Sequence, residues 1–412
     1  MTERGWTKRE ALGLAAGLAA ASVVATARAQ APGPVKIGMV IPLSGPWATT
    51  GLNIKAGCDM AIDDINKSGG IKALGGRTLE IVAADAEDSA EKAKNAAQRL
   101  LAREPDLIGG VGDVLSGMTL VVTELAERND LPWITMTFAD MLTERGFHYT
   151  FESVPVASVQ AREALPTVLK LAKDATGKQP ASVAVIADSN QALQAMAKTW
   201  RDGDFAKYNL KLVSDRTYTP PLSDPTELIE DLRRKRPDFL FLLPSNLPDL
   251  KLMLDKLNEF GLGRGKLPTF TIGGATGNPD LLRVSSPEIL ENLSGVFANW
   301  PGKKHEDLVT RFRARTGAPW MTADALNGYG QIMILRDALE QAGVADRRKV
   351  AEKIREMNGS DGAGGFFNGR LQWDDTGRRV DTQLVIVQWQ GGQPRPIFPA
   401  DLATAKPVWG GK

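Results

Sequence analysis

The segment Val35–Ile71 constrains the fold more strongly than any other part of this 412-residue chain. Its first part, Val35–Ile41, is a run of apolar and β-branched residues, which is typical of a buried parallel strand. Leu43–Pro46 then favours a turn, because Ser-Gly-Pro ends a strand and the serine can cap a helix. A helix is predicted over Leu52–Lys67, where apolar residues recur every three to four positions, and a second strand over Leu79–Ala84. The segment therefore predicts a βαβ unit.

Strands and helices alternate in the same way along the rest of the chain. Further strands are predicted at Asp106–Gly110, Trp133–Met136, Val183–Ala187, Leu210–Ser214, Phe239–Leu243 and Phe270–Gly273. Helical patterns separate these strands, and such alternation with short connections predicts an α/β fold with parallel sheets and right-handed crossovers. About 380 residues remain after the first thirty, which is too many for one core and typical of two lobes.

Residues 1–29 have the pattern of an export signal. Two basic residues precede an apolar run over Ala11–Ala25, and Ala27–Ala29 offers small residues at an A-x-A cleavage site. The run is shorter than the ~20 residues that span a bilayer. We therefore expect a signal peptide, a mature chain from Gln30 and a periplasmic location; the alternative is a disordered alanine-rich tail. The basic pair also resembles the twin-arginine export pattern, with Lys8 in place of the first arginine, so that route stays open.

Composition and motifs argue against catalysis and against nucleic-acid binding. The 50 lysines and arginines nearly balance 49 aspartates and glutamates, so neither nucleic acid nor an anionic membrane surface is expected as a partner. No nucleophile-elbow, zincin or phosphate-loop motif occurs, and the 2 histidines adjoin no metal-binding motif. Cys58, the only cysteine, lies on the apolar stripe of its helix and is predicted to be a small core residue. We expect a binding protein rather than an enzyme, with no cofactor and no metal.

Several blocks of this sequence resemble those of one known family. They are IGMVIPLSGPWATTG at Ile37–Gly51, AIDDINKSGGI at Ala61–Ile71, LIGGVGDVLSG at Leu107–Gly117, LPWIT at Leu131–Thr135 and LTERGFHYTF at Leu142–Phe151. Together they resemble the type I periplasmic solute-binding proteins of ABC transporters, and most closely the branched-chain amino acid (Leu/Ile/Val) binding proteins. The resemblance extends from Val35 to about Pro399.

The resemblance implies two doubly wound parallel-sheet lobes joined by three hinge crossings, near residues 152–157, 298–302 and 366–373. Lobe one would hold residues 30–153 and 300–368, and lobe two would hold residues 154–299 and 369–412. The lobes would close on a ligand by hinge bending, in the manner of a Venus flytrap.

The resemblance also implies a function. A monomeric protein outside the cytoplasm would capture a small organic solute, of amino-acid type or a carboxylate or aromatic acid, in a cleft between the lobes. It would deliver the solute to the inner-membrane permease subunits of an ABC importer. The alternative, from another class of protein, is the ligand-sensing domain of a signalling system.

Ligands of open α/β sheets bind beyond the carboxyl ends of the strands. That rule selects the loops Ser44–Thr50, Gly112–Ser116, Thr137–Asp140, Asp188–Gln191, Pro244–Leu247 and Gly274–Gly277. Ser44 and Asn246 are candidate polar contacts from these loops. Trp47 would offer a flat apolar wall over the cleft, with core packing as the alternative. Tyr329 matches a tyrosine common in the family and would either pack or line the rim of the cleft.

An anion site is expected at the loop that ends in Ser116. This residue matches the serine whose hydroxyl receives the ligand carboxylate in the family. It also precedes a helix predicted from Met118, where free N–H groups and the helix dipole favour an anion; the alternative role is a plain N-cap. Thr137 and Ala139 match the segment that completes this site. Ala139 stands where relatives have threonine, so Thr137 would take over that role.

The site for a ligand ammonium group departs from the family pattern. Relatives carry an acidic residue after the strand that matches Phe270–Gly273, whereas this chain has Ala275 and Thr276 there. A buried ammonium without a partner costs several kcal/mol. Either Asp188 or Asp140 takes over as its partner, or the ligand has no ammonium and is a carboxylate with an apolar or aromatic body.

Overall fold

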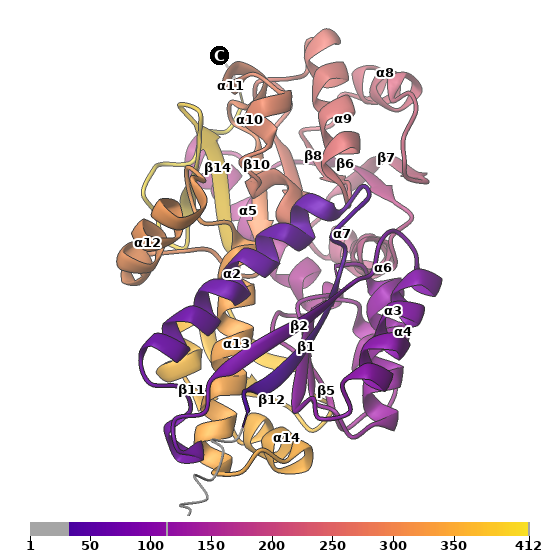
Figure 1. Ribbon diagram of the computed structural model, residues 1–412. Helices are drawn as coiled ribbons and strands as arrows, with labels where there is room; N and C mark the ends of the chain where they lie inside the picture. Colours follow the sequence, from indigo (N-terminus) through magenta and orange to yellow (C-terminus); the bar gives the residue numbers. More distant parts are fainter. Residues whose placement is uncertain (1–32, 113, 411–412) are drawn as a thin grey trace, which may run out of the picture. The chain divides into compact units, whose positions relative to one another are not determined.

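The βαβ unit predicted from the sequence is present in the computed structural model, which describes residues 33–112 and 114–410. β1 (Val35–Ile41) leads through the turn into α2 (Ala48–Lys67), and β2 (Leu79–Asp85) pairs with β1 in parallel (Figure 1). α2 begins before the predicted start at Leu52, so Trp47 occupies its N-cap position. The signal peptide and cleavage site expected at the N-terminus lie outside the described residues.

The βαβ unit belongs to a five-stranded parallel sheet with the order β2-β1-β3-β4-β5. The added strands are β3 (Gly109–Gly112), β4 (Trp133–Thr135) and β5 (Thr150–Glu152). α3 (Ala90–Arg103) follows β2, and α4 (Ser116–Arg128) follows β3. Because β2 lies on one side of β1 and β3 on the other, the strand order reverses there. In a doubly wound sheet such a reversal opens a crevice beyond the carboxyl ends of the strands.

A second sheet of seven strands has the order β15-β14-β10-β9-β8-β6-β7. Its strands are β6 (Ser182–Asp188), β7 (Lys211–Tyr218), β8 (Phe239–Leu243), β9 (Thr269–Ile272), β10 (Ser294–Phe297), β14 (Val385–Gln390) and β15 (Gln393–Phe398). β6 to β10 pair in parallel, whereas β14 and β15 are antiparallel and extend one edge. The predicted α/β fold with two parallel-sheet lobes is therefore confirmed, with an antiparallel edge added to the second lobe.

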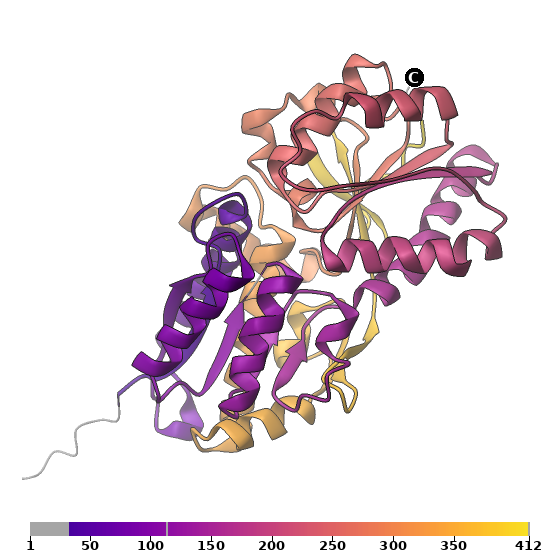
Figure 2. The ribbon, with the colours of Figure 1, turned by 90° about the vertical axis from the view of Figure 1, so that its right-hand side faces the viewer.

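Helices cover both faces of the seven-stranded sheet, as Figure 2 shows. The longer ones are α5 (Ala157–Thr176), α6 (Gln191–Thr199), α8 (Thr226–Lys235) and α9 (Leu247–Glu259), and the short ones are α7 (Phe205–Lys207), α10 (Leu281–Val284) and α11 (Pro287–Leu290). The inner parallel strands β6, β8, β9 and β10 are buried at every residue or all but one, whereas the edge strand β7 is mostly exposed or half-buried. Burial on both faces explains why β6 and β8 are nearly continuous apolar runs rather than alternating patterns.

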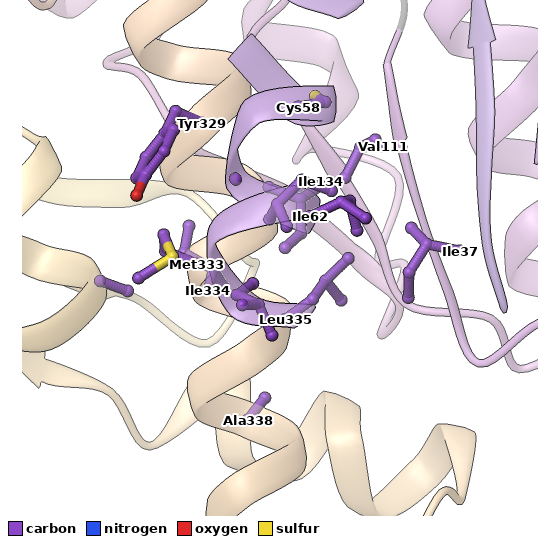
Figure 3. Close-up of a cluster of buried hydrophobic side chains, with 14 of the residues drawn as sticks. Ile37, Cys58, Ile62, Val111, Ile134, Tyr329, Met333, Ile334, Leu335 and Ala338 are labelled. Atoms are coloured by element: carbon purple, nitrogen blue, oxygen red, sulfur yellow. The ribbon is translucent and has the colours of Figure 1, made fainter. Parts of the chain in front are cut away.

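Segments far along the chain complete the first lobe. They are α12 (Glu306–Thr316), α13 (Ala323–Ala342), α14 (Arg347–Arg355) and a small antiparallel sheet of β11 (Asn358–Gly359), β12 (Gly369–Trp373) and β13 (Arg379–Thr382). The buried cluster in Figure 3 joins Ile37 and Ile62, from the N-terminal βαβ unit, to Ile334 and Leu335 of α13. The core of the first sheet is therefore built from the N-terminal part of the described chain and a distant stretch within residues 308–373.

The chain returns to the second sheet later than expected. The sequence predicts a crossing near residues 366–373. Leu371 and Trp373, however, are buried in the core of the first sheet, and the Trp373 indole N–H donates to the Glu152 carbonyl at 2.7 Å. Arg379 of β13 likewise donates to the Ser153 carbonyl at 3.0 Å. This packing favours a crossing between β13 and β14.

α2 and α13 approach each other closely because a glycine faces the contact on each helix. A Cβ atom on Gly57 would lie 1.9 Å from the Ala325 carbonyl oxygen, and one on Gly328 would lie 2.4 Å from the Ile54 carbonyl oxygen. The Cys58 thiol donates to the Gly328 carbonyl at 3.2 Å across the same contact. Cys58 is thus the buried core residue that the sequence predicts, and neither glycine has space for a larger side chain.

Replacing either contact glycine is expected to force the two helices apart. Gly57→Ala and Gly328→Ala should each lower the free energy of unfolding by about 1–3 kcal/mol or more, because the new methyl group overlaps backbone atoms. Urea denaturation followed by circular dichroism measures this loss. Gly117→Ala, in α4, is the matched control, since a Cβ there meets no atom within 4 Å, and it should leave stability unchanged or slightly raised. Wild-type stability in both contact variants would contradict the close approach.

Candidate functional site

A cavity, whose empty space of about 630 Å³ includes open solvent, is lined by residues from the carboxyl-end loops of both sheets. The lining residues are Thr50, Ile54, Val114, Leu115, Ser116, Met136, Thr137, Phe138, Asn190, Ala192, Leu193, Pro244, Ser245, Ile272, Gly273, Gly274, Ala275 and Asp324. Each strand-end loop selected from the sequence contributes to this lining, as the rule for open α/β sheets predicts. Of the contacts predicted from the sequence, the cavity brings together Ser116, Thr137 and Ala275.

Ser116 places a free hydroxyl at the start of a helix. It is the first residue of α4, and only 1% of its surface is exposed. Its Oγ atom has no hydrogen-bond partner among the described residues, and it makes no capping bond to the helix, whose N-cap position is taken by Leu115. The first N–H groups of an α-helix lack intrahelical acceptors, and the helix dipole adds positive potential there. The hydroxyl and the helix terminus together suit an anionic group.

Thr137 contributes to the same wall, but its hydroxyl is already engaged. The Thr137 Oγ1 atom lies 2.7 Å from Thr119 Oγ1 and 3.1 Å from Thr135 Oγ1. These contacts fix the loop after β4 beside the first turn of α4. Much of the remaining lining is apolar, from Ile54, Leu115, Met136, Phe138, Ala192, Leu193, Pro244, Ile272 and Ala275. The cavity therefore combines one anion-favouring end with an apolar wall.

Asp324 adds a carboxylate that the sequence did not single out. It lies in the first turn of α13, where the Thr322 hydroxyl caps the helix by accepting from the Ala325 N–H at 3.1 Å. Only 8% of its surface is exposed, and its Oδ2 atom has no hydrogen-bond partner among the described residues. Burial raises the pKa of Asp324 from 3.8 to about 7. A Cβ atom on Gly274 would lie 2.1 Å from Oδ2, so the carboxylate closely approaches the loop after β9.

A second, adjoining cavity, whose empty space of about 400 Å³ includes open solvent, shares Asp324 with the first. Three amide side chains line it: Gln160, Asn299 and Asn327. Asn299 donates to Asn327 Oδ1 at 3.0 Å, while its own Oδ1 atom is buried without a partner. Asp324 therefore lies on the lining of both cavities.

Three residues predicted as ligand contacts are placed outside the lining, with side chains engaged elsewhere. The Ser44 hydroxyl donates to Asp85 at 2.7 Å. Trp47 packs beside Val40 and Ala86 against the other face of the first sheet's strands, and it does not line the cavity. Tyr329 is a core residue whose hydroxyl donates to Asp64 at 2.9 Å, and burial raises its pKa to about 12.

Three further predicted contacts also lie outside the cavity lining. Ala139 is buried in a hydrophobic cluster of the second sheet. Asn246 caps α9, because its Oδ1 atom accepts from the Asp249 N–H at 2.8 Å. The Thr276 hydroxyl pairs with that of Thr271 beneath the loop after β9.

The two carboxylates proposed as substitutes for the missing ammonium partner are already satisfied. Asp188 accepts from the Asn190 N–H at 2.8 Å and from the Ser245 N–H at 2.7 Å. Asp140 accepts from both the N–H and the hydroxyl of Ser158. Both acids thus shape loops that surround the cavity, and neither lines it.

The polar lining residues that the sequence did not single out are Thr50, Asn190, Ser245 and Asp324. The first three lie in the selected strand-end loops, so the rule found their neighbourhood but not the residues. Asp324 lies at a helix start instead. The available signal was an acid in the first turn of a helix whose apolar residues are spread around it and not confined to one face.

Metal-binding clusters and membrane-spanning helices are both absent from the part of the chain that the structure describes. In residues 33–112 and 114–410, no three His, Cys, Asp or Glu side chains gather in a way that could hold a metal ion. Among the described helices, none has the length and apolar character needed to cross a membrane.

The chain belongs to the periplasmic binding protein family, whose model matches residues 34–393. It is 25% identical over 413 residues to the Leu/Ile/Val-binding protein homolog 8 of Brucella melitensis, covering 96% of this chain and 97% of that one. The family resemblance stated from the sequence is thereby confirmed. The proteins it resembles are solute-binding proteins rather than enzymes, in agreement with the expectation from the motifs.

Solved structures with the same fold include two with bound ligands. The branched-chain amino acid transporter substrate binding protein LivJ from Streptococcus pneumoniae, in complex with isoleucine, superposes with a TM-score of 0.75 at 17% identity, covering 88% of this chain and 97% of that one. An ABC transporter solute binding protein from R. palustris, in complex with benzoate, gives a TM-score of 0.75 at 18% identity, covering 92% and 100%. At this identity the likeness establishes the fold.

Removing the charge of Asp324 is expected to stabilise the protein in a pH-dependent way. Burial raises the pKa of Asp324 in the folded state above that in the unfolded chain, so stability falls as pH rises from 3.8 to about 7. Asp324→Asn should recover about 1–3 kcal/mol at pH 8 and less at pH 5. Denaturant unfolding at both pH values measures the difference.

The control is Asp307→Asn on α12, whose carboxylate is 86% exposed and pairs with Arg311. That variant should change stability little at either pH. A loss of stability in Asp324→Asn, or an effect equal at both pH values, would contradict an unpaired buried carboxylate.

Proposed function

We propose that this chain captures a small organic solute by its carboxylate in the cavity described above and delivers it to the inner-membrane permease of an ABC importer. The observation that carries the proposal is the Ser116 hydroxyl, which is buried, has no partner among the described residues and belongs to the first residue of α4. A hydroxyl left without a partner inside a protein is costly unless a ligand supplies one. A carboxylate oxygen would accept from this hydroxyl and from the helix N–H groups together.

The apolar wall supports a solute with a hydrocarbon body. Ile54, Phe138, Leu193 and Ile272 come from four separate elements and face the same cavity. Burying a methylene group against such a wall contributes about 0.8 kcal/mol. An aliphatic or aromatic body would gain from this wall, whereas a sugar would leave its hydroxyls unsatisfied there.

The ligands of similar proteins share this chemistry. The names of the relatives refer to leucine, isoleucine and valine, and the solved structures hold isoleucine in one case and benzoate in another. Each of these compounds joins a carboxylate to an apolar body. The proposal extends that shared chemistry to this chain, and the identity of the body is for experiment to decide.

The proposal includes a location and a motion. A family of periplasmic binding proteins and a charged-then-apolar N-terminus support export to the periplasm. We propose lobes divided near residues 153 and 299, as expected from the sequence, and between β13 and β14, as the core packing favours. Ligand binding would then draw the two lobes together about these crossings.

Ser116→Ala is expected to weaken binding of the cognate carboxylate by about 10- to 100-fold, because a hydrogen bond to a charged group contributes about 1.5–3 kcal/mol. Isothermal titration calorimetry with leucine, isoleucine, benzoate and 3-phenylpropanoate measures the change. Ser68→Ala is the matched control, since its hydroxyl donates to the Ile65 carbonyl at the far end of α2. Unchanged affinity in Ser116→Ala would refute the carboxylate site.

The charge of the solute is tested separately by its neutral analogue. Each binding acid should be at least about 10-fold tighter than its primary amide, which keeps the shape but loses the negative charge. Equal binding of benzoate and benzamide, or of leucine and leucinamide, would indicate a neutral solute instead.

A further inference from the structure

A carboxylate site at Ser116 leaves one feature of the cavity unexplained, namely the unpaired acid on the same lining. We infer that Asp324 binds a cationic nitrogen of the solute, so that the solute carries an ammonium group as well as a carboxylate. This inference rests on the proposed function and narrows its ligand from carboxylates in general to zwitterions.

Asp324 is buried without a partner among the described residues. The carboxylate of Asp324 is more than nine-tenths buried, and Oδ2 receives no hydrogen bond from any described residue. Buried carboxylates ordinarily have a cation or several N–H groups beside them. Asp188 and Asp140 show this ordinary arrangement in the same protein. Asp324 is therefore an acid whose partner is missing.

The described residues of the cavity lining supply no cation for Asp324. Among the described residues that line the cavity, Asp324 has the only ionisable side chain. The amides of Gln160, Asn299 and Asn327 in the adjoining cavity are neutral. No lysine, arginine or histidine of either lining is placed to neutralise the acid. The complementary charge must then come from the ligand.

A solute carboxylate and the Asp324 carboxylate would place two negative charges in one cavity. A solute carboxylate at Ser116 would enter a space that already holds the Asp324 carboxylate, and like charges in a poorly solvated site repel strongly. An ammonium group on the same solute removes this repulsion. A carboxylic acid without an amine would instead require Asp324 to take up a proton and donate it in a hydrogen bond, and the variants below separate these two cases.

Asp324 is held in place by the packing and capping of α13. α13 is anchored to α2 where a Cβ on Gly57 would lie 1.9 Å from the Ala325 carbonyl, one residue beyond Asp324. The Thr322 cap fixes the same turn. Gly274 leaves space for the carboxylate because it has no side chain. The acid thus has a defined position instead of turning to solvent, as a preorganised ligand contact requires.

The test compares compounds that share a skeleton and differ in their charged groups. Calorimetry would use leucine, 4-methylpentanoate and 3-methylbutylamine, then phenylalanine, 3-phenylpropanoate and 2-phenylethylamine, then 4-(aminomethyl)benzoate and 4-methylbenzoate. Wild-type protein should bind at least one zwitterion about 10- to 100-fold more tightly than its amine-free acid, because a charge-assisted hydrogen bond is added.

The variants identify the residue responsible. Asp324→Asn should lose that preference, so that the zwitterion binds no better than the acid, while Asp307→Asn keeps it. Asparagine is neutral and still donates a hydrogen bond. If Asp324 bound the solute in its protonated form, Asp324→Asn would therefore bind the solute without loss of affinity. Retained zwitterion affinity in Asp324→Asn therefore overturns the inference. Circular dichroism and unfolding of both variants confirm that the fold is intact.

The remaining outcomes also decide between the two proposals. A wild-type protein that prefers the amine-free acids, or that binds no ammonium compound, overturns the zwitterion and leaves the carboxylate site at Ser116 standing. If Ser116→Ala leaves binding unchanged while Asp324→Asn abolishes it, the role of Asp324 holds and the carboxylate site fails.

Discussion

The close contact between α2 and α13 is the constraint on which the first lobe and its side of the cavity depend. Two glycines let the helices approach until backbone meets backbone, and the contact joins residues 58 and 328, which are 270 positions apart. It closes the core around the five-stranded sheet. It also sets the first turn of α13 beside Ile54, so the packing that stabilises the lobe positions Asp324 at the cavity. The contact between α2 and α13 therefore both stabilises the lobe and positions a residue of the site.

The polarity of the cavity follows from two groups on its lining, Ser116 and Asp324. At Ser116, a helix start supplies positive potential through backbone groups and involves no charged side chain. At Asp324, a carboxylate is buried without compensation, and the free protein is less stable for it. Perturbed acids of this kind concentrate at functional sites, because a charge that the fold does not neutralise is available to a ligand. The two groups thus favour opposite charges by different physical means.

The sequence predicts the features that depend on local pattern. The βαβ unit, the alternating strands and the strand-end loops all follow from periodicity and turn residues, and the loops do line the cavity. Side-chain roles depend on partners distant in sequence. Ser44 bonds Asp85 and Tyr329 bonds Asp64, so neither hydroxyl is free. Asp324 escapes notice because its burial is created by α2 and by the loop at Gly274, neither of which is near it in the chain. The third crossing is predicted near residues 366–373, whereas the burial of Trp373 in the first core, which is tertiary, favours a later position.

The separation of the two contact glycines has a consequence for how the molecule assembles. Until α13 has been synthesised, the face of α2 that carries Gly57 and Cys58 has no partner, and the first sheet lacks part of its core. The seven-stranded sheet, by contrast, takes its five parallel strands from one continuous stretch of chain between β6 and β10. Contacts between distant segments form slowly because a long loop must close first. The parallel strands of the second sheet are therefore expected to assemble before the core of the first sheet closes, although the first sheet lies earlier in the chain.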